Sequence, residues 1–159
     1  MLPQEIIRKK RDRAVLSQTE IATFVQRIAR DEASPAQIAA FGMAVFLNGM
    51  NTEETVALTN HLARSFENVV LTQDWHPAGH LSFASSHDGK SPYETIDMPY
   101  GPQVLWPDHC VQGTDGAAFH ADLDIPHAAK IIQKGFRPEI DSYSAFFDND
   151  RQTPTELSE

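Results

Sequence analysis

The stretch Asn68-Val-Val-Leu-Thr-Gln-Asp74-Trp-His76-Pro-Ala-Gly-His80 decides the fold of the second part of the chain. Residues 68–73 are a short apolar run rich in β-branched side chains, which is typical of a strand buried in a parallel sheet. Functional groups in open α/β sheets gather where the strands end. Asp74 and His76 stand there two residues apart, so both side chains project to the same side of an extended backbone. The stretch therefore predicts an α/β unit with a polar site at the end of its first strand.

Further histidines and a long loop follow this strand. His80 comes after a proline bend, and His109 occurs much later, within Trp106-Pro-Asp-His-Cys-Val111. A loop of that length in a compact domain is usually functional or disordered, and a bound metal would give it a reason to be ordered. A carboxylate with two or three imidazoles suits Zn²⁺, Mn²⁺ or Fe²⁺. Spacing alone leaves two interpretations: a metal site built from Asp74 and these histidines, or a polar loop whose histidines form local hydrogen bonds.

A second strand is predicted over Ala129-Lys-Ile-Ile-Gln-Lys134-Gly135, where again a charged residue stands at the end of an apolar run. On pattern alone, Lys134 is an exposed lysine beside a turn glycine. The run Asp141-Ser-Tyr-Ser-Ala-Phe-Phe147 follows, and its Tyr143 either lines a pocket or simply packs. The local sequence pattern alone therefore assigns no function to Lys134 or Tyr143.

Charge divides the 159-residue chain into two parts. Residues 1–65 hold 8 Lys+Arg and 7 Asp+Glu, whereas residues 66–159 hold 5 and 15, together with six of the seven histidines. Such a shift predicts two domains with different roles, 1–65 and 66–159.

Composition also excludes several classes of protein. The formal net charge of −9 argues against non-specific binding to nucleic acid. No apolar run approaches the roughly 20 residues that cross a bilayer, so no membrane partner is expected. The start of the chain lacks the apolar core of a secretory signal. Because the single cysteine, Cys110, also fits a reducing compartment, a cytoplasmic location is expected.

The first 65 residues carry the start signals of helices. Pro3 suits the first turn of a short helix. Three capping boxes begin at Ser17, Ser34 and Asn51, each with Glu or Gln three residues later and an apolar helical stripe behind it. Short connections between helices of this length predict a compact antiparallel unit of three or four helices. No catalytic constellation is present in this segment.

The helical segment also resembles a known family. The resemblance is carried by Glu5-Ile-Ile-Arg-Lys-Lys-Arg-Asp12, Leu16-Ser17, and Gln37-Ile-Ala-Ala-Phe-Gly-Met-Ala44 with Asn48-Gly-Met50. These runs look like the amino-terminal helical segment of thymidine phosphorylase, over about residues 1–65. In that family the helices take part in dimer contacts, so the resemblance leaves a homo-oligomer open. The family's phosphate-binding loop is not found here, so none of its functional residues is carried over.

The second segment resembles a different family. Its motifs are Thr72-Gln-Asp-Trp-His-Pro-Ala-Gly-His80, Ser82-Phe-Ala-Ser-Ser-His87, Leu105-Trp-Pro-Asp-His-Cys-Val-Gln112, and Lys134-Gly135 with Asp141-Ser-Tyr-Ser-Ala-Phe-Phe-Asp-Asn149. In this order they resemble bacterial nicotinamidase/pyrazinamidase of the isochorismatase-like hydrolases, over about residues 66–157. The resemblance implies a parallel sheet flanked by helices. It also implies hydrolysis of nicotinamide or pyrazinamide, with one divalent metal ion that binds the ring nitrogen.

The same resemblance assigns roles to individual residues. Four match the family's metal ligands, the last of them only in some members: Asp74, His76, His109 and His80. Lys134 matches the lysine of an Asp/Lys/Cys catalytic triad. Two aromatic residues match the wall of the substrate pocket: Trp106 and Tyr143.

The other two members of the triad are not found where the family has them. The family's aspartate lies on its first strand, where this chain has helices, and the nucleophilic cysteine lies in a motif that does not occur before Glu159. Cys110 is the only thiol, and a metal on the neighbouring His109 would lower its pKa. Adjacent residues usually point in different directions, however, so a small buried hydrophobe is the expected role and a catalytic Cys110 the alternative.

The sequence therefore predicts a chimaera. The expected fold is a helical segment followed by an incomplete parallel α/β unit with a long metal-site loop. The expected function is that of a nicotinamidase-type amidohydrolase that keeps its metal motif but is inactive alone. Two alternatives stand beside it: a metal-binding fragment without catalysis, and a thymidine phosphorylase-type helical dimerisation module.

Overall fold

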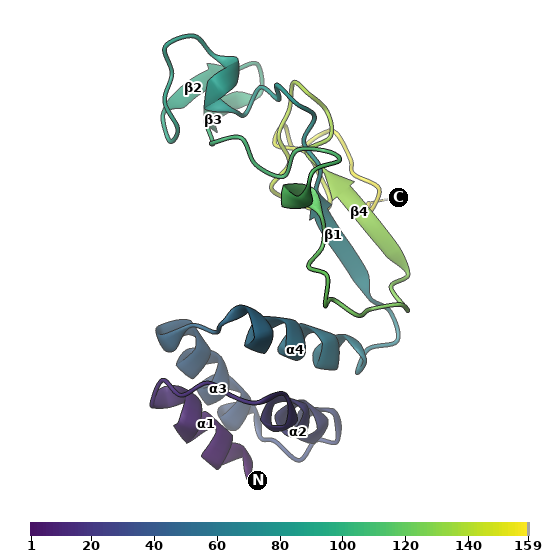
Figure 1. The fold of residues 1–159 in the computed structure, drawn as a ribbon. Helices are drawn as coiled ribbons and strands as arrows, with labels where there is room; N and C mark the ends of the chain where they lie inside the picture. Colours follow the sequence, from purple (N-terminus) through teal and green to yellow (C-terminus); the bar gives the residue numbers. More distant parts are fainter. Residues whose placement is uncertain (159) are drawn as a thin grey trace. The chain divides into compact units, whose positions relative to one another are not determined.

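The computed structural model describes residues 1–158, which form two compact units (Figure 1). The first unit comprises Met1–Val69 together with His120–His127, and the second comprises Val70–Phe119 and the described residues from Ala128 onward. All four α-helices of the described chain lie in the first unit and all four strands in the second. The predicted fold, a helical part followed by an incomplete α/β unit, is confirmed.

Local signals at the helix starts account for the helical unit. The helices are α1 (Pro3–Arg11), α2 (Gln18–Ala29), α3 (Pro35–Asn48) and α4 (Thr52–Ala63). The three predicted capping boxes all form, because the side chains of Ser17, Ser34 and Asn51 accept backbone N–H groups at the first turns of α2, α3 and α4. None of the helices in residues 1–158 is both long and apolar enough to cross a membrane.

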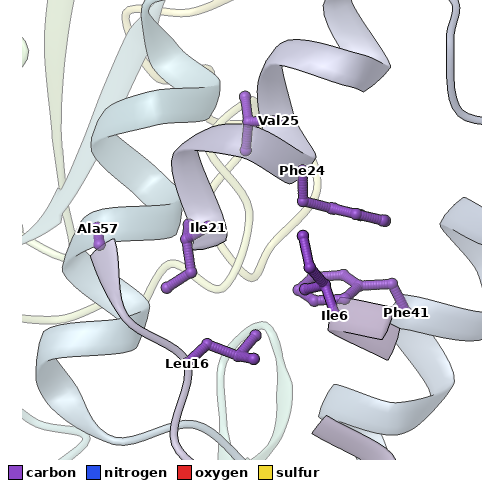
Figure 2. Close-up of a cluster of buried hydrophobic side chains, with 7 residues drawn as sticks. All are labelled: Ile6, Leu16, Ile21, Phe24, Val25, Phe41 and Ala57. Carbon is purple, nitrogen blue, oxygen red and sulfur yellow. The ribbon is translucent and has the colours of Figure 1, made fainter. Parts of the chain in front are cut away.

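All four helices contribute to one hydrophobic core. Helix α1 packs against α3, and α2 packs against α4. The apolar stripe predicted for α2 supplies much of this core, which contains seven buried side chains (Figure 2): Ile6, Leu16, Ile21, Phe24, Val25, Phe41 and Ala57. The rings of Phe24 and Phe41 are in contact, with centroids 4.3 Å apart and ring planes inclined at 32°. Burial of each large side chain contributes about 1.5–3 kcal/mol, so the core is the main stabilising feature of the unit.

A buried ion pair joins α1 to the start of α4. Lys10 Nζ lies 2.8 and 3.0 Å from the two carboxylate oxygens of Glu54. The backbone N–H groups of Leu16 and Asn51 donate to the same carboxylate at 2.8 and 2.9 Å. Burial alone would raise the pKa of Glu54, but these hydrogen bonds outweigh it and hold the pKa below its ordinary value. Glu54 therefore acts both as part of a capping box and as the anchor of α1.

A distant segment, His120–His127, packs with the helical unit. The side-chain amide of Asn60 on α4 donates to the carbonyl of Asp122 and accepts the N–H of Asp124, both at 2.9 Å. Arg64 forms an ion pair with the carboxylate of Asp124. Nothing in the sequence pattern had indicated this contact between α4 and residues 120–127.

Two pairs of strands make up the sheet structure of the second unit. β1 (Val70–Asp74) and β4 (Lys130–Lys134) pair in parallel and lie side by side in Figure 1. β2 (Thr95–Met98) and β3 (Gly101–Val104) form an antiparallel hairpin. Two short 3₁₀ turns, Ala84–Ser86 and Asp115–Ala117, complete the regular structure. Since parallel strands end at the same edge, the register brings Asp74 directly opposite Lys134.

The hairpin lies within the predicted loop between His80 and His109. Its signal was present in the sequence, because Thr95-Ile-Asp-Met98 alternates between polar and apolar side chains and leads into a Pro-Tyr turn. The length of the connection predicts only a loop here, so the hairpin is a finding of the structure. The hairpin gives the loop internal order and places its last strand just before Trp106.

Candidate functional site

A cavity of about 230 Å³ lies at the carboxyl ends of β1 and β4. It is lined by Asp74, His76, Trp106, His109, Lys134, Asp141, Ser142 and Tyr143. Six of the seven residues that the sequence analysis selected are among them; His80 is the one that is not. The parallel pairing of the strands explains why residues so distant in sequence share one cavity.

Strand register places the aspartate and the lysine of the cavity together. Asp74 and Lys134 are the last residues of β1 and β4, and their side chains form an ion pair. Lys134 Nζ also donates to the carbonyl of Ser142 at 3.1 Å. The Lys134 ammonium therefore already has two partners, one of which is the carboxylate predicted to bind a metal.

Backbone pairing beyond β1 brings the two histidine-containing loops together. The N–H of His76 donates to the carbonyl of Cys110 at 3.0 Å, and the N–H of Gln112 donates to the carbonyl of His76 at 2.8 Å. These bonds form a parallel bridge between His76 and Val111. The imidazole rings of His76 and His109 consequently lie with centroids 4.8 Å apart.

Two close contacts hold the imidazole of His76 in place. Its Nε2 lies 3.1 Å from a carboxylate oxygen of Asp141, and both side chains are almost fully buried. Gly135 packs against the same nitrogen, because an added Cβ there would lie only 2.7 Å from His76 Nε2. Burial raises the pKa of Asp141, but the hydrogen bonds from His76 and from the N–H of Ser142 outweigh it and lower the pKa overall. Asp141 was missed by the sequence analysis as a site residue, although it opens the quoted run 141–147.

The aromatic wall of the cavity is joined by hydrogen bonds. Trp106 Nε1 donates to the hydroxyl of Tyr143 at 3.0 Å, and the two rings meet nearly edge to face. Gln103 Nε2, from β3, donates to the same hydroxyl at 2.9 Å. Gln103 is only 1% exposed and was also missed, because a single glutamine carries no sequence signal of its own.

His80 lies outside the cavity lining. It is fully buried, its Nδ1 lies 2.8 Å from the Ser82 hydroxyl, and its Nε2 lies 3.3 Å from the carbonyl of Ile140. Burial, helped by the neighbouring His76, lowers the pKa of its imidazole. Both ring nitrogens are thus used in hydrogen bonds, one of them local, to Ser82, and the other long-range, to Ile140.

Cys110 is poorly suited to act as a nucleophile. The free thiol is half-buried rather than fully buried, and it does not line the cavity. Burial raises its pKa, the Asp74 carboxylate raises it further, and the Lys134 ammonium only partly compensates. Because the thiolate is the reactive form, this environment keeps Cys110 in its unreactive, protonated form.

The donor types in the cavity suit a divalent cation. Asp74, His76 and His109 offer one carboxylate and two imidazoles, a set typical of Zn²⁺, Mn²⁺ or Fe²⁺. The buried Nδ1 of His76 has no hydrogen-bond partner within residues 1–158, which is the mark of a nitrogen available to a ligand. In the same residues, however, no three His, Cys, Asp or Glu side chains already converge on a common point. The types of side chain therefore suit a divalent metal ion, but these side chains would have to move closer to one another to bind it.

Comparison with known proteins shows what the second part of the chain resembles. Nicotinamidase of Acinetobacter baylyi is 56% identical over 106 residues, which are 67% of this chain and 50% of that protein. Among solved structures, the nicotinamidase/pyrazinamidase of Acinetobacter baumannii matches with a TM-score of 0.63 at 56% identity, over 69% of this chain and 56% of that one. The yeast nicotinamidase bound to the inhibitor nicotinaldehyde matches with a TM-score of 0.58 at 32% identity, over 67% of this chain and 54% of that one.

The first part resembles different proteins. The family model for the glycosyl transferase family helical bundle domain matches residues 4–66. Thymidine phosphorylase of Agrobacterium fabrum is 54% identical over 59 residues, which are 37% of this chain and 14% of that protein. The chain spans about half the length of the nicotinamidases it matches and a smaller share of the phosphorylase. The two-family resemblance predicted from the sequence is thereby confirmed: a phosphorylase-type helical bundle precedes a nicotinamidase-like α/β unit.

Proposed function

We propose that the second unit carries the metal-binding and substrate-binding part of a nicotinamidase site and that this chain alone does not turn nicotinamide over. The observation that carries the proposal is the cavity at the ends of β1 and β4. It gathers two carboxylates, two imidazoles, an ammonium group and two aromatic rings, in a segment 56% identical to a nicotinamidase. Its volume of about 230 Å³ suits a ligand the size of a single aromatic ring.

Six side chains of the cavity have a proposed part in the site. Asp74, His76 and His109 would hold the divalent cation, which supplies a Lewis-acidic contact for the ring nitrogen of a pyridine amide. Trp106 and Tyr143 offer aromatic surfaces against which a pyridine ring packs. Lys134 would remain as the inherited catalytic lysine, with its ammonium held next to the carboxylate of Asp74.

Hydrolysis requires a nucleophile that this cavity does not contain. An amide is cleaved in this chemistry when a thiolate attacks its carbonyl carbon, and Cys110 is the chain's only thiol. Its raised pKa and its position outside the lining oppose that role. The proposal is therefore a binding-competent, catalytically incomplete amidohydrolase.

The activity is tested by measuring ammonia release from nicotinamide with the purified, metal-loaded chain beside its Cys110→Ala variant. We expect release at background level from both proteins. Release that disappears in Cys110→Ala would identify Cys110 as the nucleophile and would contradict the proposed inactivity.

The metal site is tested by the thermal stability of the second unit with added Zn²⁺ or Mn²⁺. A ligand that binds only the folded state raises the unfolding temperature, so we expect an upward shift for the wild-type chain. The shift should disappear in Asp74→Ala and persist in Lys134→Met. Both substitutions break the ion pair between these residues, but only the first removes a proposed ligand. An unchanged wild-type temperature would refute the metal site.

A second candidate function, pairing of two copies through the helical unit, rests on the surface of α3. This helix contains no charged residue, and it exposes four large apolar side chains: Ile38, Met43, Phe46 and Leu47. Phe46 and Leu47 are 80% and 69% exposed, and adjacent exposed apolar groups of this size are typical of an interface. Sedimentation should show a dimer that Phe46→Glu dissociates. The control is Phe66→Glu, the same substitution at a residue outside α3, and it should leave the dimer intact. A wild-type chain that sediments as a monomer would exclude this candidate.

A further inference from the structure

A chain of hydrogen bonds beside the cavity starts at a donor whose direction is fixed. The backbone N–H of Tyr143 donates to Asn149 Oδ1 at 3.1 Å. Because a backbone N–H can only donate, this bond identifies which end of the Asn149 amide is oxygen. Asn149 Nδ2 must then face Gln103, where it donates to Oε1 at 3.2 Å. The hydroxyl of Tyr100 donates to the same Gln103 oxygen at 3.1 Å.

The orientation of Gln103 follows from these two donors. With Oε1 turned towards Asn149 and Tyr100, its Nε2 donates to the carbonyl of Val104 at 2.7 Å and to the hydroxyl of Tyr143 at 2.9 Å. All the hydrogen-bonding positions of this amide are filled, as expected for a side chain that is only 1% exposed. Turning the amide over would set donor against donor and oxygen against carbonyl.

The hydroxyl of Tyr143 receives a second donor from Trp106. An indole N–H can only donate, and Trp106 Nε1 lies 3.0 Å from the Tyr143 oxygen. The oxygen therefore accepts two hydrogen bonds, from Gln103 and Trp106, and its own proton is left to donate elsewhere. Tyr143 lines the cavity and is 59% exposed, so this proton is available to a bound molecule.

We propose that Gln103 is a positioning residue that fixes the Tyr143 hydroxyl as a hydrogen-bond donor towards a carbonyl or carboxylate oxygen of the ligand. The inference rests on the proposed function of the cavity and adds a rule of selectivity to it. A pyridine ring that carries an acceptor, such as nicotinate, should bind better than a ring that carries a donor at the same position, such as 3-aminopyridine. Gln103 itself does not line the cavity and acts only through Tyr143.

Two substitutions separate this rule from simple damage to the wall. Tyr143→Phe removes the donor. Asn149→Asp exchanges one amide nitrogen for an oxygen of nearly the same size and sets a negative charge against Gln103 Oε1. We expect Gln103 to turn its Nε2 towards the new carboxylate and its Oε1 towards Tyr143, although the turn gives up its hydrogen bond to the Val104 carbonyl. The Tyr143 proton would then be drawn to Gln103, and the hydroxyl would present only an acceptor to the ligand.

The experiment measures dissociation constants of nicotinate and 3-aminopyridine for the full chain by calorimetry, with the indole N–H signal of Trp106 followed by NMR. We expect nicotinate to weaken about tenfold in both variants, the size of one hydrogen bond to a charged acceptor. 3-Aminopyridine should be unaffected in Tyr143→Phe and tighter in Asn149→Asp. Arg151→Gln is the matched control, because it changes the net charge equally two residues away and should leave both constants unchanged.

Each other outcome contradicts the inference. An unchanged preference in Asn149→Asp, with the Trp106 signal retained, would show that Gln103 does not set the hydroxyl. If Asn149→Asp loses the indole N–H signal of Trp106, the test rests on Tyr143→Phe. A dissociation constant of nicotinate that is unchanged in Tyr143→Phe then refutes the donor role of the hydroxyl. Absence of nicotinate binding to the wild-type chain also refutes it. Ammonia release from nicotinamide is measured separately. A switch of preference from nicotinate to 3-aminopyridine without ammonia release supports the inference. Ammonia release without such a switch supports hydrolysis and refutes the inference.

Discussion

Gly135 meets two requirements at once at the end of β4. Its φ is +67°, a left-handed conformation that glycine adopts without strain, and its Cα faces the imidazole of His76 with no room for a Cβ. The glycine therefore lets the backbone after Lys134 close against His76 and hold it near Asp141. The glycine at position 135 thus helps to fix the position of His76, a candidate metal ligand.

Gly135→Ala tests that contact, with Gly113→Ala as its control. Gly113 has a similar φ of +75°, but an added Cβ there would meet nothing within 4 Å. We expect Gly113→Ala to lower the free energy of unfolding by about 1 kcal/mol through backbone strain alone, and Gly135→Ala by about 2–4 kcal/mol because overpacking adds to it. Urea unfolding followed by tryptophan fluorescence reports on the second unit, since Trp75 and Trp106 both lie there. Equal losses in the two variants would show that the close approach to His76 carries no cost.

Residues of the site were predictable where a local pattern marks them. Asp74 and His76 stand at the end of an apolar run with the two-residue spacing of a strand, and this pattern alone suggested a common site. Gln103 and Asp141 carry no such pattern, because each is a single polar residue in irregular sequence. Gln103 contacts Tyr143 across 40 positions, and Asp141 contacts His76 across 65. Only the folded chain brings these partners together.

At the scale of the element, the first turn of α4 makes the helical unit sensitive to acid. The carboxylate of Glu54 is stabilised by Lys10 and by two backbone N–H groups, and its pKa lies below the ordinary value of 4.5. A group whose pKa is lowered by folding contributes stability above its unfolded pKa and loses it as the pH falls through the folded pKa. Glu20, whose pKa is lowered chiefly by its hydrogen bond from Lys9, contributes in the same direction.

We therefore expect the unfolding free energy of the helical unit to fall as the pH drops below about 4.5. Far-UV circular dichroism follows this unit, because the α-helices of the described chain all belong to it. Glu54→Gln should cost about 3 kcal/mol at pH 7, the effect of breaking a buried pair, and its deficit should shrink in acid. Glu53→Gln, an exposed neighbour in the same turn, should cost about 0.5 kcal/mol at most. A deficit for Glu54→Gln that is the same at pH 7 and in acid would contradict this account.

Elements were predictable to the extent that their signals are local. Each predicted capping box forms, because a cap depends on a side chain and a backbone N–H only three residues apart. The two apolar strands were also found in advance. The β2–β3 hairpin has a local signal in only one of its strands: Thr95–Met98 alternates between polar and apolar side chains, whereas β3 begins with Gly101-Pro102, a pair that is unusual in strands.

At the scale of the whole molecule, the sequence predicts two parts, but it does not predict which residues belong to each of them. The change in charge near residue 65 and the two separate resemblances both suggest a single crossing from one unit to the next. In the structure the chain returns, because His120–His127 belongs with the helices. The segment has no helical or strand periodicity that could have indicated this. Asn60 contributes to its attachment, because the Asn60 amide donates to the carbonyl of Asp122 and accepts the N–H of Asp124.

Asn60→Ala tests whether this amide holds the returning segment. Without it, the N–H of Asp124 and the carbonyl of Asp122 lose their partners, so we expect amide exchange at Asp124 to accelerate about tenfold, the effect of one lost hydrogen bond. Thr59→Ala is the control, because the Thr59 hydroxyl donates only to the carbonyl of Thr55 within α4. Hydrogen exchange measured residue by residue should show the change at Asp124 in the first variant and not in the second. Unaltered exchange at Asp124 in Asn60→Ala would mean that the ion pair with Arg64 suffices to hold the segment.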